Sequence, residues 1–246
     1  MTAHELFFKS ALIQQPSSAA GWMDNVSMTI RNGVIEAIST DRKPKEGAKI
    51  VSGVAVPSMV NVHSHAFQRA FGGLSEFRTA NKDSFWTWRK LMYDFALKLT
   101  PDDVYVIARQ LYLEMVNAGY SWVGEFQYLH NDKTGQGYSD RARMARVILK
   151  AATDSGIGVC LLPVLYQQSG FDVLAPIKKQ RRFILSLEDY WTLLEACKNA
   201  VADLPNAAVG MAVHSLRAAS KDSIQKVIEF RKKDIPDCPV HIHIAE

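Results

Sequence analysis

The sequence predicts an α/β fold in which the first strands of a (β/α) barrel follow a small β-layer. Three observations favour it. Apolar strand-like segments alternate with helical segments after about residue 57, as in parallel sheets covered by helices. Polar residues, His130 and Tyr166 among them, follow successive strand ends, which share one face in a parallel barrel, where a functional site is built. The earlier residues form only short strand-like runs. We therefore expect two domains, residues 1–56 from a small β-sandwich and residues 57–246 with five barrel strands.

The N-terminal region has strand-like runs at residues 5–12, 26–30 and 34–38. Asn32-Gly33 separates the last two runs, and Asn-Gly between alternating apolar runs is a strong hairpin signal. The first barrel strand is interpreted as a buried run that begins at residues 54–56, breaks at Pro57 and resumes at residues 59–60.

The rest of the chain alternates between helical and strand-like patterns. Apolar spacing predicts a helix over residues 85–99, with Asp83 and Ser84 as cap candidates. Thr100-Pro101 places a capping residue before proline at the first helical position, and Gly119 ends this second helix. The remaining predicted helices cover residues 141–155, 187–202 and 221–233, and the predicted strands cover 120–126, 158–165, 209–213 and 240–244.

Composition narrows the class of protein. The 246 residues are 48% hydrophobic, and 29 basic against 25 acidic residues give a net charge of +4. The basic residues are scattered, the densest runs being 178–182 and 231–233, so we expect no nucleic-acid binding. Cys160, Cys197 and Cys238 form no C-x-x-C pair, which favours a reducing compartment. No apolar run is long enough for a leader or a membrane span, so we expect a cytoplasmic protein.

Histidines near two strand ends predict a metal site. His63 and His65 lie two apart, so their side chains point to the same side of the strand. On the last strand His243 is the third candidate ligand, and His241 competes with it because it lies on the same side. Three imidazoles and an open position are typical of a catalytic zinc or iron ion, and zinc lowers the pKa of a bound water to about 7.

Three charged residues are candidates for work on a substrate. Glu246 lies three residues after His243, where a carboxylate suits proton transfer to a leaving nitrogen. Arg89 and Arg217 could each pair bidentately with a substrate carboxylate, and Arg217 is the better candidate because it follows the strand end at His214.

These residues carry a family resemblance. The segment Asn61 to His65 resembles the metal-binding N-x-H-x-H entrance of the amidohydrolase superfamily, whose domain is a TIM-like (β/α)8 metal-dependent hydrolase barrel. The longer run H-S-H-A-F-Q-R, residues 84–89 (S-F-W-T-W-R) and 125–128 (E-F-Q-Y), H-S-L-R at 214–217 and H-I-H-I-A-E at 241–246 resemble the formimidoylglutamate deiminase branch over essentially the whole chain.

The resemblance implies zinc-dependent hydrolysis of N-formimino-L-glutamate to N-formyl-L-glutamate and ammonia, in histidine degradation. It implies one zinc ion, or iron or another divalent metal, on His63, His65 and His243, and it assigns Glu246 to the formimino nitrogen. It assigns the glutamate part to five residues: Gln68, Arg89, Tyr128, His214 and Arg217. It also allows a homodimer.

Two alternatives remain: a deaminase of a purine-like ring, and a non-catalytic remnant that acts as an interaction module. Ser58 and Gln127 depart from the family pattern in a minor way, at positions where glycine and histidine are usual. The larger departure is that the chain stops after about five strands. We therefore expect an incomplete and inactive fragment, because a further aspartate ligand and a proton-shuttling histidine of the family would lie beyond Glu246.

Overall fold

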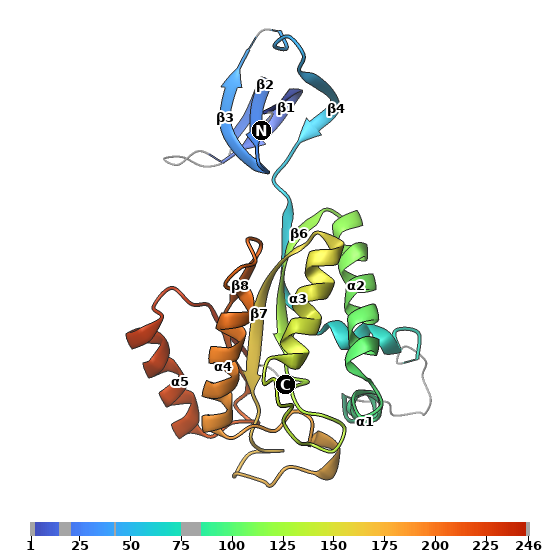
Figure 1. The fold of residues 1–246 in the computed structure, drawn as a ribbon, viewed down its shortest axis with the longest axis vertical. Helices are drawn as coiled ribbons and strands as arrows, with labels where there is room; N and C mark the ends of the chain where they lie inside the picture. The colour runs from blue at the N-terminus through green and yellow to red at the C-terminus, as the bar shows by residue number, and fades with distance from the viewer. Residues whose placement is uncertain (1–2, 15–20, 42, 75–84, 245–246) are drawn as a thin grey trace. The chain divides into compact units, whose positions relative to one another are not determined.

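The computed structural model describes residues 3–14, 21–41, 43–74 and 85–244. Its contacts divide the chain into two compact units, Met1–Ser58 and Met59–Glu246, which are described separately. Figure 1 shows a small sheet in the first unit and an α/β arrangement in the second. None of the described helices is both long and apolar enough to cross a membrane.

The first unit is a four-stranded sheet in the order β3-β2-β1-β4. Its strands are β1 (His4–Ile13), β2 (Gly21–Arg31), β3 (Val34–Thr40) and β4 (Lys49–Ala55). β2 and β3 form the predicted hairpin, and both turn residues, Asn32 and Gly33, have positive φ as a type I′ turn requires. Its buried core consists of Phe8, Ala11, Val26 and Met28.

One strand prediction was wrong in this region. Val54 and Ala55 belong to β4, where they pair with β1, and the first strand of the second unit, β5 (Met59–Ser64), begins only after Pro57. β5 is also not the buried strand that was predicted. Its residues Val60 and Val62 are 57% and 65% exposed. The reason is its place at the end of the described sheet, where β6 is its hydrogen-bonded neighbour. An apolar run alone did not reveal that edge position.

The second unit is built on a six-stranded sheet in the order β10-β9-β7-β6-β5, with β8 beside β7. All of its strand pairs are parallel, as predicted. The strands after β5 are β6 (Tyr120–Gln127), β7 (Gly158–Leu165), β8 (Ala207–Val209), β9 (Met211–Ser215) and β10 (Val240–His243). The predicted strand at 209–213 is divided at Gly210, where an added Cβ would lie 3.0 Å from the Pro239 carbonyl oxygen.

Five α-helices connect the described strands. They are α1 (Phe85–Ala96), α2 (Pro101–Asn117), α3 (Arg143–Ser155), α4 (Leu187–Val201) and α5 (Lys221–Asp234). α1 ends three residues before the predicted Leu99, and its cap candidates Asp83 and Ser84 lie outside the described residues. Two 3-10 helices, η1 (Ala66–Phe71) and η2 (Lys178–Gln180), were not predicted.

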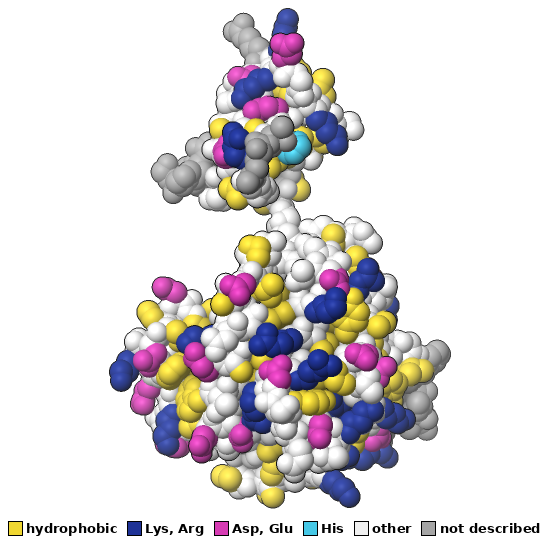
Figure 2. All heavy atoms as spheres, in the orientation of Figure 1, with side chains coloured by type: hydrophobic (Ala, Val, Ile, Leu, Met, Phe, Trp, Pro, Cys, Tyr) yellow, Lys and Arg dark blue, Asp and Glu magenta, His cyan; other side chains and the backbone are white. Residues whose placement is uncertain are grey.

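The core of the second unit lies between the sheet and its helices. β6 and β7 contribute Val123, Phe126, Leu161 and Leu162, all 1% exposed or less, as expected for strands covered on both faces. On the face seen in Figure 2, lysine and arginine side chains are interspersed with acidic ones. This mixed surface agrees with the scattered charge of the sequence.

The N-terminus of α2 gives a stability prediction. Thr100 Oγ1 accepts a hydrogen bond from the Asp103 amide, and the Asp103 carboxylate accepts one from the Thr100 amide. Thr100→Ala removes half of this capping box, so we expect the free energy of unfolding to fall by about 1 kcal/mol. Urea denaturation at neutral pH measures it, with the exposed Lys98→Ala as a control outside the box. Equal midpoints for Thr100→Ala and the unmodified protein would contradict the prediction.

Candidate metal centre and adjoining pocket

The first two histidines lie where β5 ends. His63 is the penultimate residue of the strand, and His65 immediately precedes η1. Their rings converge as the strand alternation predicted, with the two Nε2 atoms 3.0 Å apart. The sequence motif therefore brings two metal-binding atoms to one point.

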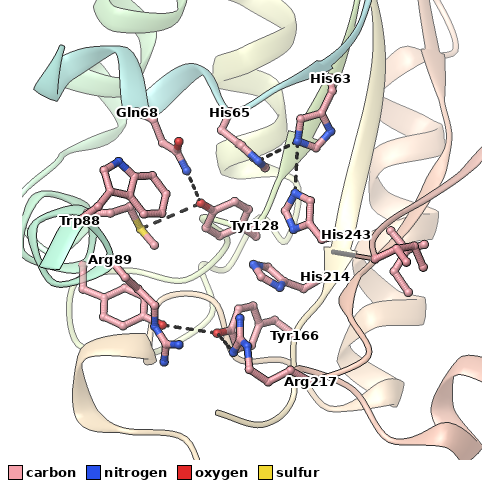
Figure 3. Close-up of a pocket in the computed structure, with 14 residues that line it drawn as sticks. His63, His65, Gln68, Trp88, Arg89, Tyr128, Tyr166, His214, Arg217 and His243 are labelled. Carbon is pink, nitrogen blue, oxygen red and sulfur yellow. Dashed lines mark hydrogen bonds between the residues drawn. The ribbon is translucent and has the colours of Figure 1, made fainter. Parts of the chain in front are cut away.

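The third histidine comes from the other end of the described sheet. His243 on β10 places its Nε2 3.2 Å from Nε2 of His63, and the three ligand atoms all lie within 4.8 Å of one another. Figure 3 shows the three rings facing one another across the strand ends. Within the described residues His241 is not part of this group. The structure thus favours His243 over its competitor.

The surroundings of His63 and His65 favour the neutral form that can bind a metal. Nδ1 of His65 lies 3.1 Å from the carbonyl oxygen of Phe126. A carbonyl can only accept, so Nδ1 donates its proton there and Nε2 keeps its lone pair. Burial lowers the pKa of His65 to about 3 and also lowers the pKa of His63. Both imidazoles are therefore neutral at neutral pH, the form that binds metals.

The donor set fits a divalent ion. Nε2 of His63 faces two other Nε2 atoms, yet one neutral ring nitrogen offers only a single proton or a single lone pair. Hydrogen bonds among the three rings therefore cannot satisfy the cluster. Two nitrogens bound to a tetrahedral zinc ion at about 2.0–2.1 Å lie roughly 3.3 Å apart. The observed separations of 3.0 and 3.2 Å are close to that value.

A buried carboxylate holds the backbone beside the cluster. Glu125 on β6 is fully buried, and its carboxylate accepts hydrogen bonds from the Ala66 amide at 2.7 Å and the Tyr112 hydroxyl at 3.0 Å. Burial raises the pKa of Glu125, against the opposing effect of these hydrogen bonds. Because Ala66 follows His65 directly, Glu125 fixes the chain at the end of the H-x-H motif.

A cavity of about 440 Å³ adjoins the histidines. Besides the competing His241, nine site residues were predicted, and eight of them line this cavity; the ninth, Glu246, lies outside the described residues. The lining residues are His63, His65, Gln68, Trp88, Arg89, Met92, Tyr93, Tyr128, Tyr166, His214, Arg217, Ile242, His243 and Ile244.

Polar groups of the cavity are held by specific contacts. Gln68 on η1 donates to the Tyr128 hydroxyl at 2.6 Å. The His214 ring centre lies 4.4 Å from that of Tyr166, and Nδ1 of His214 is 3.1 Å from the Ser215 hydroxyl. Burial, with His243 next in effect, lowers the pKa of His214 well below its usual value. A neutral His214 can therefore donate or accept a hydrogen bond inside the cavity without adding charge.

Three lining residues from α1 were given no role in the site. Trp88 and Met92 belong to the apolar stripe that predicted the helix, and Tyr93 lies beside that stripe. Tyr166 follows β7 directly and lines the cavity, as its place among the polar residues at the strand ends suggested.

His130, which was grouped with the polar strand ends, has a structural position. It is 6% exposed, does not line the cavity, and its Nε2 donates to the Val164 carbonyl at 3.0 Å. Burial lowers its pKa to about 4. The expectation that it joins the site was wrong, because the ring turns into the protein interior after β6.

The lowered pKa of His130 makes the free energy of unfolding depend on pH. Between pH 6.5 and about 4 the unfolded chain binds a proton at His130 that the folded chain does not, so the free energy of unfolding falls as the pH falls. The full effect is roughly 3 kcal/mol. His130→Gln keeps a donor for Val164 but does not titrate, so its loss of stability on acidification should be smaller. Denaturation of metal-free protein at pH 7 and pH 4.5 measures the difference, and parallel curves would contradict it.

Residues 54–246 match the model of the Amidohydrolase family. The chain belongs to this family. It is 43% identical to formimidoylglutamate deiminase of Pseudomonas aeruginosa over 98% of the chain and 51% of that relative. It is also 23% identical to 5′-deoxyadenosine deaminase of Methanosphaera stadtmanae over 96% of the chain and 49% of that relative. This amidohydrolase chain thus spans about half the length of the curated relatives it matches.

Solved structures agree with the fold. An amidohydrolase from Brucella melitensis superimposes with a TM-score of 0.88 at 41% identity, covering 98% of this chain and 51% of its own. A guanine deaminase from C. acetobutylicum has a TM-score of 0.68 at 16% identity, covering 98% of this chain and 53% of its own, and shows the fold alone. The predicted amidohydrolase barrel, represented here by its five-stranded parallel path, is therefore confirmed.

Proposed function

We propose that the complete protein hydrolyses N-formimino-L-glutamate to N-formyl-L-glutamate and ammonia. The observation that supports this most is the arrangement of three histidine Nε2 atoms beside a cavity that also contains Arg89 and Arg217. A substrate with two carboxylates can occupy both guanidinium groups and present its formimino carbon to the histidines. The similarity to formimidoylglutamate deiminase supports the same substrate.

His63, His65 and His243 would hold one divalent ion, and zinc suits this all-imidazole set best. When bound, the ion supplies Lewis-acid activation of water and of the formimino group. The nitrogens of His63, His65 and His243 therefore fix where on the substrate the reaction occurs.

The remaining residues bind and orient the substrate. Arg217 is the better placed anion partner, because it is only 9% exposed and a carboxylate there is shielded from water. Arg89 on α1 takes the second carboxylate. The Gln68–Tyr128 pair and His214 supply neutral hydrogen-bonding groups between the arginines and the histidines. These contacts would hold the two carboxylates of the substrate at the arginines, at a distance from the formimino carbon that reacts.

Proton transfer completes the reaction. Hydrolysis adds water across the C=N bond of the formimino group, breaks that bond and leaves a formyl oxygen on the carbon. The nitrogen departs as ammonia, so it must receive protons. We assign Glu246 to this step as the catalytic acid, since it lies three residues after the ligand His243 in the sequence.

Ammonia release by the complete, zinc-loaded protein tests the proposal. We expect kcat/KM for N-formimino-L-glutamate to exceed that for adenosine by at least about 1,000-fold, because the nucleoside has no carboxylates for Arg89 and Arg217 to bind. Metal chelation should abolish turnover. Faster deamination of the nucleoside would contradict the proposal and favour a ring deaminase. Turnover that survives chelation would contradict the proposed metal-dependent reaction.

The setting of the reaction is part of the same proposal. Histidine degradation supplies this substrate in the cytoplasm, and the three free cysteines, Cys160, Cys197 and Cys238, suit a reducing compartment. A homodimer is compatible with it, and sedimentation of the complete protein would show its oligomeric state.

A further inference from the structure

The two arginines of the cavity are each held by a tyrosine. Arg217 donates from Nη1 to the Tyr166 hydroxyl at 3.3 Å and to the Ser169 carbonyl at 3.2 Å. The Arg89 guanidinium lies over the ring of Tyr93, 5.2 Å from its centre, within the range of a cation–π contact. Figure 3 shows Arg89, Tyr166 and Arg217 along one side of the cavity, away from His63 and His65.

A single glutamine joins the two tyrosines. Gln180 at the end of η2 is completely buried, and its Nε2 donates to the Tyr166 hydroxyl at 2.8 Å and to the Tyr93 hydroxyl at 3.0 Å. Its Oε1 accepts from the Ile177 amide at 2.9 Å, which fixes the orientation of the side-chain amide. Both donors and the acceptor of Gln180 are therefore used.

These contacts connect separate elements. Tyr93 lies on α1, the helix that carries Arg89, whereas Tyr166 follows β7 and meets Arg217 from the loop after β9. The two hydroxyls are 3.5 Å apart, and burial raises the pKa of Tyr93, so its phenol stays neutral and accepts from the amide. Gln180 itself does not line the cavity. Both tyrosines do line it, so they connect Gln180 to a bound ligand.

We propose that Gln180 is a positioning residue that fixes the separation of the Arg89 and Arg217 guanidinium groups and so makes the site selective for the length of a dicarboxylate. This rests on the proposed function. A ligand anchored at both ends must match the distance between its anchors, and a rigid pair of anchors penalises a mismatch more than a loose pair does. Loss of the Gln180 link therefore lowers selectivity for length more than it lowers turnover.

Two variants test the link. Gln180→Met keeps the length of the side chain but removes both donors, and Tyr93→Phe removes one accepting hydroxyl while keeping the ring beneath Arg89. The readout is the ratio of kcat/KM for N-formimino-L-glutamate over N-formimino-L-aspartate, which has one methylene fewer. One methylene is worth about 10–200-fold in a fitted site, and we expect this ratio to fall at least about fivefold in each variant. In Gln180→Met, which changes no residue of the cavity lining, kcat for the glutamate substrate should change by less than about threefold.

The double variant and a neighbouring pair serve as controls. Because both changes break one linkage, the double variant should lose little more selectivity than Gln180→Met alone. Lys179→Met breaks the exposed Lys179–Asp94 ion pair, which joins the same segment to the same helix, and it should leave the ratio unchanged. A loss of selectivity in Lys179→Met as large as in Gln180→Met would overturn the specific role of Gln180.

Binding without turnover separates this inference from the proposed function. Calorimetry on the complete, zinc-loaded protein compares glutarate, with the carboxylate spacing of glutamate, against succinate, with that of aspartate. We expect the unmodified protein to prefer glutarate and both variants to lose most of that preference. An unmodified protein that hydrolyses the substrate, with variants of unchanged preference, overturns the Gln180 role alone. An unmodified protein that neither binds glutarate nor hydrolyses the substrate overturns both. If Gln180→Met does not fold, Tyr93→Phe decides by the same criterion.

Discussion

His243→Asn is expected to reduce the divalent metal bound by the complete protein and to abolish turnover. Its Nε2 lies 3.2 Å from Nε2 of His63, and an asparagine amide is too short to take that place. Loss of a residue that only supports a ligand costs about 10–100-fold in metal affinity, so loss of the ligand itself should cost at least about 100-fold. Metal content after dialysis against dilute zinc, with kcat/KM for N-formimino-L-glutamate, measures the effect.

His241→Asn is the matched control. The residue lies two positions earlier on β10, is of the same type and half-buried, yet does not belong to the three-histidine group of the described chain. Metal content and kcat/KM should both stay within about twofold of the unmodified protein, as is usual for a substitution away from a site. An equal loss of metal in His241→Asn would show that β10 binds the ion through a different residue.

Arg217→Met is expected to have the second largest effect. Methionine keeps much of the volume but removes the charge, so a buried substrate carboxylate loses its partner. Removing one partner of a buried, hydrogen-bonded charge pair costs about 2–4 kcal/mol, a roughly 30- to 1,000-fold loss in kcat/KM. Metal content should not change, because Arg217 is not among the ligands. Steady-state kinetics and metal analysis of the same preparation measure both quantities.

A second arginine of the same unit provides the comparison. Arg69 on η1 forms an exposed ion pair with Glu114 and does not line the cavity. Arg69→Met removes the same charge and should change kcat/KM by less than about threefold. The proposed role of Arg217 would be contradicted if its variant were no more affected than this one, or if glutarate bound the Arg217 variant as tightly as the unmodified protein.

Local patterns predicted much of the fold because the residues concerned act locally. Thr100-Pro101 begins α2 and Gly156 ends α3 in the left-handed conformation, which are properties of those residues themselves. The alternation of strands with helices gave the parallel sheet. The strand at residues 54–60 was misassigned because apolar runs do not reveal which sheet a segment joins, and Pro57 in fact separates strands of two sheets.

The candidate site was likewise predicted only in part. His63 and His65 could be paired from their spacing, and His243 from its place at a strand end. The link through Gln180 could not be predicted, because its partners Tyr93 and Tyr166 are 87 and 14 residues away and meet it only in the folded chain. His130 was misplaced for a different reason. The sequence does not show whether a histidine that follows a strand turns its ring toward the cavity or into the interior.

The most direct test of the account is a crystal structure of the complete protein with zinc and N-formyl-L-glutamate, the proposed product. We predict zinc bonded to Nε2 of His63, His65 and His243, with the formyl group beside it. One carboxylate should lie within hydrogen-bonding distance of Arg217 and the other within that distance of Arg89. A metal bound away from these three histidines, or a ligand whose carboxylates contact neither arginine, would contradict the account.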